Sequence, residues 1–260
     1  MSSVGSPGRS PAPAVSPRER ALLLAALALL TTLAWLDLFH LGAAMSMAAM
    51  PGMRPWAGTE FALAWLMWTV MMVGMMTPSA APMLLTHALV AKSAARASRR
   101  FASTAWFASG YLLAWTGFSL VAAAAQFTLQ RAGWLTPGLA PARPALAAGV
   151  LIVAGLYQLT ALKSACLSHC RAPLRFIQHH GGFRPHASGA LALGLRHGLY
   201  CIGCCWALMA LLFAVGIMNL AWVAAIAGCV LVEKALPVGP RFARLSGLAC
   251  AAWGLALLAL

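Results

Sequence analysis

Long apolar stretches separated by short basic segments constrain this chain more than any other feature of its sequence. A helix needs about 20 predominantly apolar residues to cross the hydrocarbon core of a bilayer. We assign seven stretches as spans of this kind, at 21–39, 57–77, 102–129, 145–162, 199–218, 220–232 and 241–260. The pattern therefore predicts an all-α fold, a polytopic membrane bundle of about seven transmembrane helices.

Composition argues against a soluble protein. Hydrophobic residues make up 62% of the chain and charged residues only 8%, whereas soluble domains contain roughly 25% charged residues. The net charge of +14 resembles that of nucleic-acid binders, but here the basic residues lie between apolar stretches rather than on one surface. We therefore expect the lipid bilayer to be a partner and nucleic acid not to be one.

The basic residues also predict an orientation. If the N-terminus is cytoplasmic, only Arg54, Arg131 and Arg143 fall on the outer side, and all other lysines and arginines fall on the inner side. This split follows the positive-inside rule and predicts a multi-pass protein of the bacterial inner membrane, with the N-terminus inside and the C-terminus outside. Residues 1–17, rich in Ser, Pro, Gly and Ala, are predicted to be a disordered tail, and residues 18–260 a single transmembrane domain.

Five of the seven cysteines form two tight groups. The first group follows the inner end of the fourth apolar stretch, and the second opens the fifth, so both are predicted at the cytoplasmic edge of the membrane. Thiols stay reduced in the cytosol, where clustered cysteines bind metals or take part in catalysis more often than they form structural disulfides. The two groups are Cys166 with Cys170, and Cys201 with Cys204 and Cys205.

Two histidines accompany these cysteines. His169 lies inside the first group, and His197 precedes Cys201 by four residues, a spacing that places both on one face of a helix. Soft thiolates favour copper(I), zinc or iron–sulfur clusters, so we predict a metal site with His169 and His197 as further ligands. Free cysteine also packs as a small hydrophobe, and this reading is favoured for the isolated Cys229 and Cys250.

Methionine is the second unusual feature. Thioethers are soft ligands that select copper(I), and they remain available where thiols are oxidised. One group is predicted in the first outer loop and another along the second helix, which together would form a path for a soft metal toward the inner thiols. Methionine also fills gaps in helix packing, and for the helix the two interpretations are equally supported. The groups are Met45, Met47, Met50 and Met53 in the loop, and Met67, Met71, Met72, Met75 and Met76 in the helix.

The remaining titratable residues receive simpler predictions. Glu233 and Lys234 are adjacent in sequence and are predicted to form an ion pair at the inner boundary. Three histidines of the polar segment 163–188, His179, His180 and His186, are predicted to be solvated. With only four carboxylates in the chain, and no phosphate-binding loop or nucleophile elbow, hydrolytic catalysis is not indicated.

Several blocks of sequence stand out: WTVMMVGMMTP at 68–78, LKxxCxxxCRxP at 162–173 and GLRHGxYCxGCCWxLM at 194–209, followed by GxMNxxW at 216–222 and by Glu233-Lys234. They resemble a bacterial family of predicted metal-binding integral membrane proteins of unknown function. The resemblance implies a metal site within these blocks and leaves the activity open.

Three functions follow from these residues. The first is binding of a soft metal ion, copper(I) favoured and zinc as a variant at a Cys/His site, for transport, delivery or sensing, with a metalloenzyme-assembly protein or a second copy of the chain as partner. The second is a membrane thiol–disulfide oxidoreductase, because Cys201 and Cys204 have the C-x-x-C spacing, although no cysteine lies in an outer loop. The third is a structural membrane subunit whose cysteines only pack.

Overall fold

The computed structural model describes residues 16–48, 58–96, 103–180 and 186–259, and within these ranges the chain is helical without a β-strand. Residues 1–15 of the predicted tail lie outside the described residues. Pro17, which we placed in the tail, is instead the first residue of a helix, a position that suits proline because its missing N–H would be unpaired there anyway.

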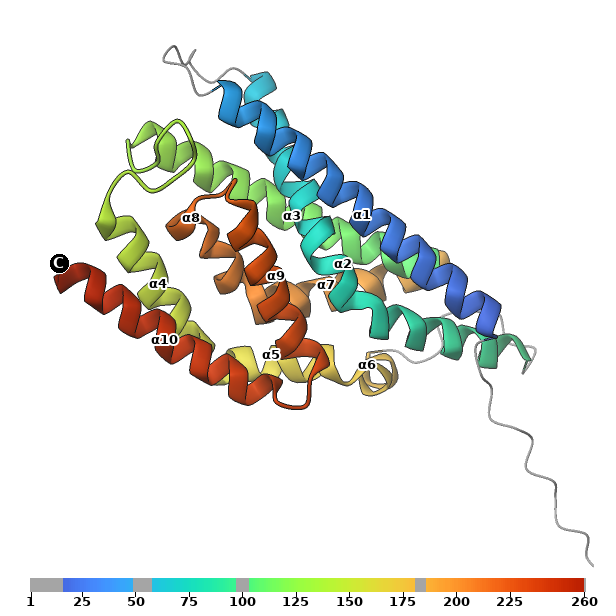
Figure 1. Cartoon of the computed structure of the whole chain (residues 1–260). Coiled ribbons are helices and arrows are strands. Elements are labelled where there is room, and N and C mark those ends of the chain that lie inside the picture. Colours follow the sequence, from blue (N-terminus) through green and yellow to red (C-terminus); the bar gives the residue numbers. More distant parts are fainter. Residues whose placement is uncertain (1–15, 49–57, 97–102, 181–185, 260) are drawn as a thin grey trace, which may run out of the picture.

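Ten helices are described (Figure 1). Most of them follow the apolar stretches of the sequence. They are α1 (Pro17–Ala48), α2 (Gly58–Arg96), α3 (Thr104–Arg131), α4 (Pro144–Gln158), α5 (Ala161–Arg171), α6 (Pro173–His179), α7 (Ala187–Ala210), α8 (Leu212–Val215), α9 (Leu220–Ala235) and α10 (Gly239–Ala259).

Five helical segments of the described chain are long and apolar enough to cross a membrane. They are α1, α2, α3, α7 with α8, and α10, and a sixth span results if α4 and α5, which meet at an angle of 65°, are counted as one broken span. The predicted stretch 220–232 forms α9, whose 16 residues reach only about 24 Å at 1.5 Å per residue. The structure thus confirms that the described chain is all-helical, with five or six segments long and apolar enough to cross a membrane, and the count of seven remains a prediction.

The outer faces of these helices are apolar. Leu22 of α1, Leu63 of α2 and Leu245 of α10 each expose more than 60% of their surface. Soluble monomers rarely expose large contiguous apolar patches, so this exterior is compatible with a membrane protein.

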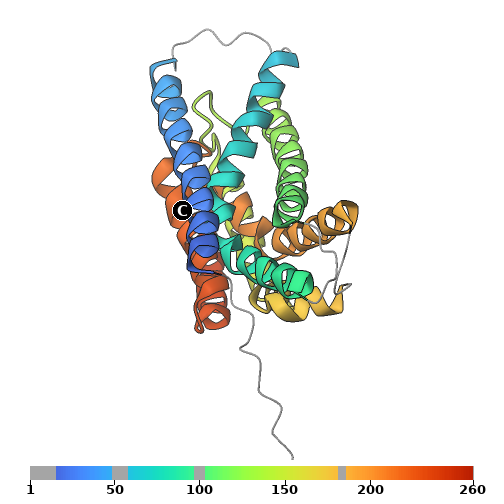
Figure 2. The same cartoon turned by 90° about the vertical axis from the view of Figure 1, so that its right-hand side faces the viewer.

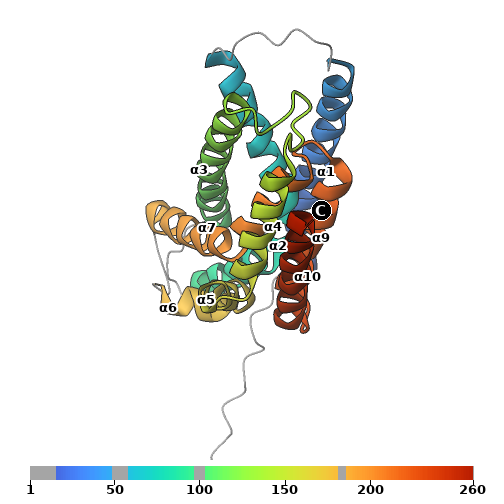
Figure 3. The same ribbon diagram turned by 90° about the vertical axis from the view of Figure 1, so that its left-hand side faces the viewer.

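The described part of the polar segment 163–188 is largely helical. It forms α5 and α6, and α7 begins at Ala187, well before the predicted start at residue 199. Thr160 caps α5 by accepting a hydrogen bond from the Lys163 backbone N–H, and Leu167 and Phe176 are buried. The segment is therefore helical because it has an apolar face to bury, and α5 and α6 lie across one end of the bundle (Figures 2 and 3).

Small residues set the distance between α3 and α7. A Cβ atom on Gly110 would lie 2.0 Å from the Leu191 carbonyl oxygen, and one on Gly194 would lie 2.0 Å from the Phe107 carbonyl oxygen. Glycines at such contacts let helix backbones approach closely. The close approach holds the start of α7 against the start of α3, and it fixes the face that α7 turns toward the core.

Helix α2 continues through Pro78 and Pro82 to Arg96, beyond the predicted end of the second span at residue 77. Hydroxyl groups next to the prolines bind backbone carbonyls: Thr77 donates to Val73 O at 2.6 Å and Ser79 donates to Met76 O at 2.9 Å. The prolines remove the helical donors to the carbonyls of Gly74 and Pro78, and the two hydroxyl bonds reinforce the neighbouring turns. The helix therefore continues past both prolines.

Candidate metal centre

Sulfur atoms from three helices meet in the buried core. Three of these sulfur atoms come from α7, at Cys201, Cys204 and Cys205. Their spacing of three and four residues places them on one face of the helix, and each residue is only 1% exposed. Cys170 approaches them from α5 and Met76 from α2. These five residues, named here the sulfur cluster, join the two cysteine groups that the sequence separates by some thirty residues.

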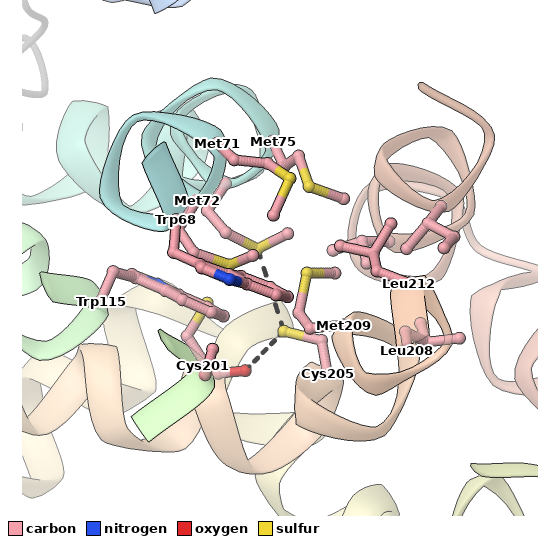
Figure 4. Packing of buried hydrophobic residues seen from close by; sticks show 14 of the residues in the cluster. Trp68, Met71, Met72, Met75, Trp115, Cys201, Cys205, Leu208, Met209 and Leu212 are labelled. Atoms are coloured by element: carbon pink, nitrogen blue, oxygen red, sulfur yellow. Dashed lines mark hydrogen bonds between the residues drawn. The ribbon is translucent and has the colours of Figure 1, made fainter. Parts of the chain in front are cut away.

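The contacts within the sulfur cluster are pairwise. Cys170 Sγ lies 3.8 Å from Cys204 Sγ, and Cys205 Sγ lies 3.9 Å from Met76 Sδ. The thiols of Cys204 and Cys205 also contact the Cys201 carbonyl oxygen, at 3.1 and 2.7 Å. The dashed lines from Cys205 in Figure 4 mark its contacts with Met76 and with the Cys201 carbonyl.

The Cys201 sulfur has two polar neighbours. Lys234 Nζ of α9 lies 2.8 Å from Cys201 Sγ and donates a second hydrogen bond to Ser79 Oγ at 3.2 Å. The Tyr111 hydroxyl of α3 lies 3.2 Å from the same sulfur. The ammonium group thus places a positive charge directly beside a buried thiol, where it can compensate the charge of a thiolate.

The predicted ion pair between Glu233 and Lys234 is wrong. Glu233 instead binds Lys163 of α5, with Nζ and Oε2 2.6 Å apart and both side chains almost completely buried, and it accepts a further hydrogen bond from Gln158 at 2.9 Å. Consecutive residues of a helix point about 100° apart. Glu233 therefore faces α5 while Lys234 faces the thiols.

Cys166 of α5 packs against a different side of α7, at Gly203. It is half-buried, and a Cβ atom added to Gly203 would come within 2.8 Å of its Sγ. Tyr157 donates a hydrogen bond to the Gly203 carbonyl oxygen from the same direction. The absence of a side chain at Gly203 is what allows Cys166 and α5 to approach α7 this closely.

His197 is buried beside the sulfur cluster. Its side chain is 3% exposed, and its ring lies 5.7 Å from the Tyr111 ring and 5.1 Å from the Phe176 ring. Among the described residues its Nδ1 has no hydrogen-bond partner. An unsatisfied buried nitrogen is costly, and a metal ion is one partner that would satisfy it, so the ligand role of His197 stays a prediction.

His169 lies at the edge of this region. Its ring stacks on Tyr200 with centroids 4.3 Å apart, and its Nδ1 lies 3.0 Å from the Ala165 carbonyl oxygen. His180 packs on Phe176 and approaches the Tyr200 hydroxyl at 3.3 Å, and burial lowers the pKa of its imidazole. His180 is therefore partly covered by these rings and only partly solvated, whereas His179 and His186 are exposed as expected.

The methionines of α2 extend the cluster along the helix. Met71, Met72, Met75 and Met76 are at most 1% exposed, and Figure 4 shows the first three on the side of α2 that faces Cys205 and Met209 of α7. Sequence reasoning assigned no ligand role to Met209, which is also buried. The thioethers are thus continuous with the thiols, and their burial is equally what core packing would produce.

The predicted outer-loop methionines lie partly on α1 and partly outside the described residues. Met45 and Met47 belong to the last turns of α1 rather than to a loop, because that helix continues beyond the predicted span. Their side chains, and Met50 and Met53 altogether, lie outside the described residues. Their role in capturing a metal stays a prediction.

A closed metal site is not formed by the described residues. Within 16–48, 58–96, 103–180 and 186–259, no three or more Cys, His, Asp or Glu side chains are arranged to hold a metal ion. The seven cysteines are all free thiols.

The chain is thus a bundle of long apolar helices whose core gathers thiol and thioether sulfur atoms. These groups are the ligands that soft metal ions prefer. The chain matches the model of the PpoB2 copper chaperone family over residues 65–257, which include the whole sulfur cluster and Lys234. The chain belongs to this family, and its function is related to copper. The match agrees with the predicted resemblance to a metal-binding family. No curated protein and no solved structure matches the chain.

Proposed function

We propose that this chain is a multi-pass membrane protein that binds copper(I) at the sulfur cluster and delivers it to a protein that assembles a copper enzyme. The observation that carries the proposal is the meeting of Cys170, Cys204, Cys205 and Met76, from three helices, with sulfur–sulfur distances of 3.8 and 3.9 Å in the buried core. Thiolates and thioethers together select copper(I) over harder cations.

Charge supports the same proposal. Metal binding requires thiolates rather than thiols, and copper(I) held by two thiolates carries a net negative charge. A buried charge is costly unless it is paired. Lys234, 2.8 Å from Cys201 Sγ, supplies the compensating positive charge, so we assign it as a residue that stabilises the copper-loaded cluster without binding the metal.

A delivery role is favoured by the position of the cluster. It lies close to α5 and α6, which cross one end of the bundle (Figure 3), and the positive-inside distribution makes this end cytoplasmic. In the proposed topology the bent pair α4–α5 is one span and α9 is a short seventh. Copper would then enter along the α2 methionines and leave from the cysteine end.

Metal content tests the proposal. The protein is purified anaerobically, loaded with copper(I) or zinc, and analysed by mass spectrometry beside two variants. Cys170→Ser/Cys204→Ser/Cys205→Ser removes the thiols of the cluster that contact another sulfur, and Cys229→Ser/Cys250→Ser removes two thiols outside it. We expect near-stoichiometric copper in the wild type and in the control, and loss of copper in the triple variant.

The result also separates the alternatives. Zinc in place of copper would assign the site to zinc, and equal copper in both variants would move the site elsewhere. If no metal binds, thiol–disulfide exchange between Cys170 and Cys204 becomes the leading function. Exchange requires an accessible thiolate, and Cys204 is 1% exposed, which is why copper binding is preferred.

A further inference from the structure

A second polar feature, separate from the sulfur cluster, lies where α5 and α6 meet the start of α10. These elements enclose a cavity of about 310 Å³. Its polar lining is basic and hydroxylated rather than acidic. The lining includes Ser164, Ser168, Arg171, Arg175, Pro240 and Arg244, and we name it the arginine pocket.

The positive charge of the arginine pocket is not neutralised by a carboxylate. Lys163, which also borders it, is paired with Glu233. Ion pairs among the described residues are limited to this one and to Lys92 with Glu19. The two other acidic residues of the chain belong to α1 and to the first turn of α2, so the three guanidinium groups face the cavity without an acidic partner.

The guanidinium groups are not equally mobile. Arg171 donates hydrogen bonds to the carbonyl oxygens of Glu233 and Leu236, at 2.5 and 2.7 Å, so its position is fixed against α9. Arg175 and Arg244 are exposed and can close on a bound group. Pro240, at the start of the 21-residue α10, adds the positive end of a helix dipole. The pocket is therefore built to hold an anion.

The surroundings of the pocket are apolar. Leu174 precedes Arg175 and is 52% exposed, and Leu248, one turn beyond Arg244 on the same face of α10, is 55% exposed. A ligand whose charged group enters the pocket would lay any apolar tail on these leucines. That combination of an anionic head and an apolar tail is the chemistry of a phospholipid.

We propose that the arginine pocket binds a phosphate group, supplied by the headgroup of an anionic phospholipid. Guanidinium groups bind phosphate through paired hydrogen bonds, and basic pockets between membrane helices recognise acidic headgroups. A bound lipid would link α5, which carries Cys166 and Cys170, to α10. The proposal is independent of copper binding because no lining residue is a proposed copper ligand.

Native mass spectrometry of the full-length protein tests the pocket. The protein is released from micelles containing phosphatidylglycerol or phosphatidylcholine, and retained lipid is counted. We compare Arg175→Gln/Arg244→Gln with Arg196→Gln/Arg241→Gln, which removes the same two charges from exposed positions outside the pocket. We expect one preferentially retained phosphatidylglycerol in the wild type and the control, and roughly tenfold weaker retention in the pocket variant.

Two further arms complete the test. Arg175→Lys/Arg244→Lys keeps the charge and should retain lipid better than the Gln variant, which distinguishes a local role from misfolding. If inorganic phosphate displaces the lipid at equal concentration, the pocket is still a phosphate site, but its ligand is a soluble anion rather than a lipid. Equal retention of phosphatidylcholine, or equal loss in the pocket variant and the control, would overturn the proposal.

Discussion

Lys234→Met should weaken copper(I) binding although residue 234 binds no metal in our proposal. The substitution removes the ammonium group that lies 2.8 Å from Cys201 Sγ and retains a long apolar side chain of similar length. The thiolates would then hold copper(I) with an uncompensated negative charge in the core.

The size of the effect follows from this contact. Two unit charges 2.8 Å apart attract by about 6 kcal/mol at an effective dielectric constant of about 20, which is an upper bound because both groups also lose hydration. Hydrogen bonds to charged groups contribute a net of about 1.5–3 kcal/mol. We therefore expect the Kd for copper(I) to rise roughly 10- to 150-fold.

The assay is anaerobic competition with a colorimetric copper(I) chelator. Lys234→Arg serves as the matched variant, because it keeps the charge and should lose much less affinity. Circular dichroism establishes that each variant retains its helices. Wild-type affinity in a folded Lys234→Met protein, or an equal loss in Lys234→Arg, would refute charge compensation by Lys234.

Three further changes have distinct expected outcomes. Glu233→Gln leaves a buried ammonium group unpaired and should destabilise the protein by about 3–5 kcal/mol, seen as a lower Tm; an unchanged Tm would contradict the burial of the pair. Gly194→Ala forces a Cβ against a carbonyl oxygen at 2.0 Å, whereas Gly228→Ala enters open space, so only the first should lower the Tm. Met76→Leu conserves volume and should cost less than about 1.5 kcal/mol of stability while weakening copper(I) binding. Met83→Leu, at a buried position of the same helix, should cost a similarly small amount of stability and leave copper(I) binding unchanged; equal copper affinities would remove Met76 from the site.

The long helices could be predicted because hydrophobic length is a local property of the sequence. The apolar stretches correspond to α1, α2, α3 and α10 with shifts of a few residues at most at their starts. Prediction was weakest at 163–188, where polar residues outnumber apolar ones. There the helices form because Leu167, Phe176 and Ile177 are buried, and such burial depends on what α5 and α6 pack against.

The candidate centre was predictable in its residue types and unpredictable in its contacts. Soft ligands at close spacing pointed to Cys204 and Cys205, but that Met76 meets Cys205 depends on how α2 packs on α7. Lys234 was assigned the wrong partner because the neighbouring carboxylate was taken as the nearest one. A lysine in the last turn of an apolar helix normally reaches the interface, so its burial beside the thiols depends on helix packing that the sequence does not show.

The buried pair of Lys163 and Glu233 has a consequence for the rotation of α9 about its own axis. Between apolar helices in lipid, there is little hydrophobic driving force to prefer one rotation over another, and the exposed and buried faces of α9 are both largely apolar. The ion pair between Glu233 and Lys163 of α5 fixes how far α9 is rotated about its axis. Because Lys234 is the next residue, the contact that holds Glu233 on α5 also directs the ammonium group toward Cys201. The pair therefore sets the charge beside the sulfur cluster without contacting it.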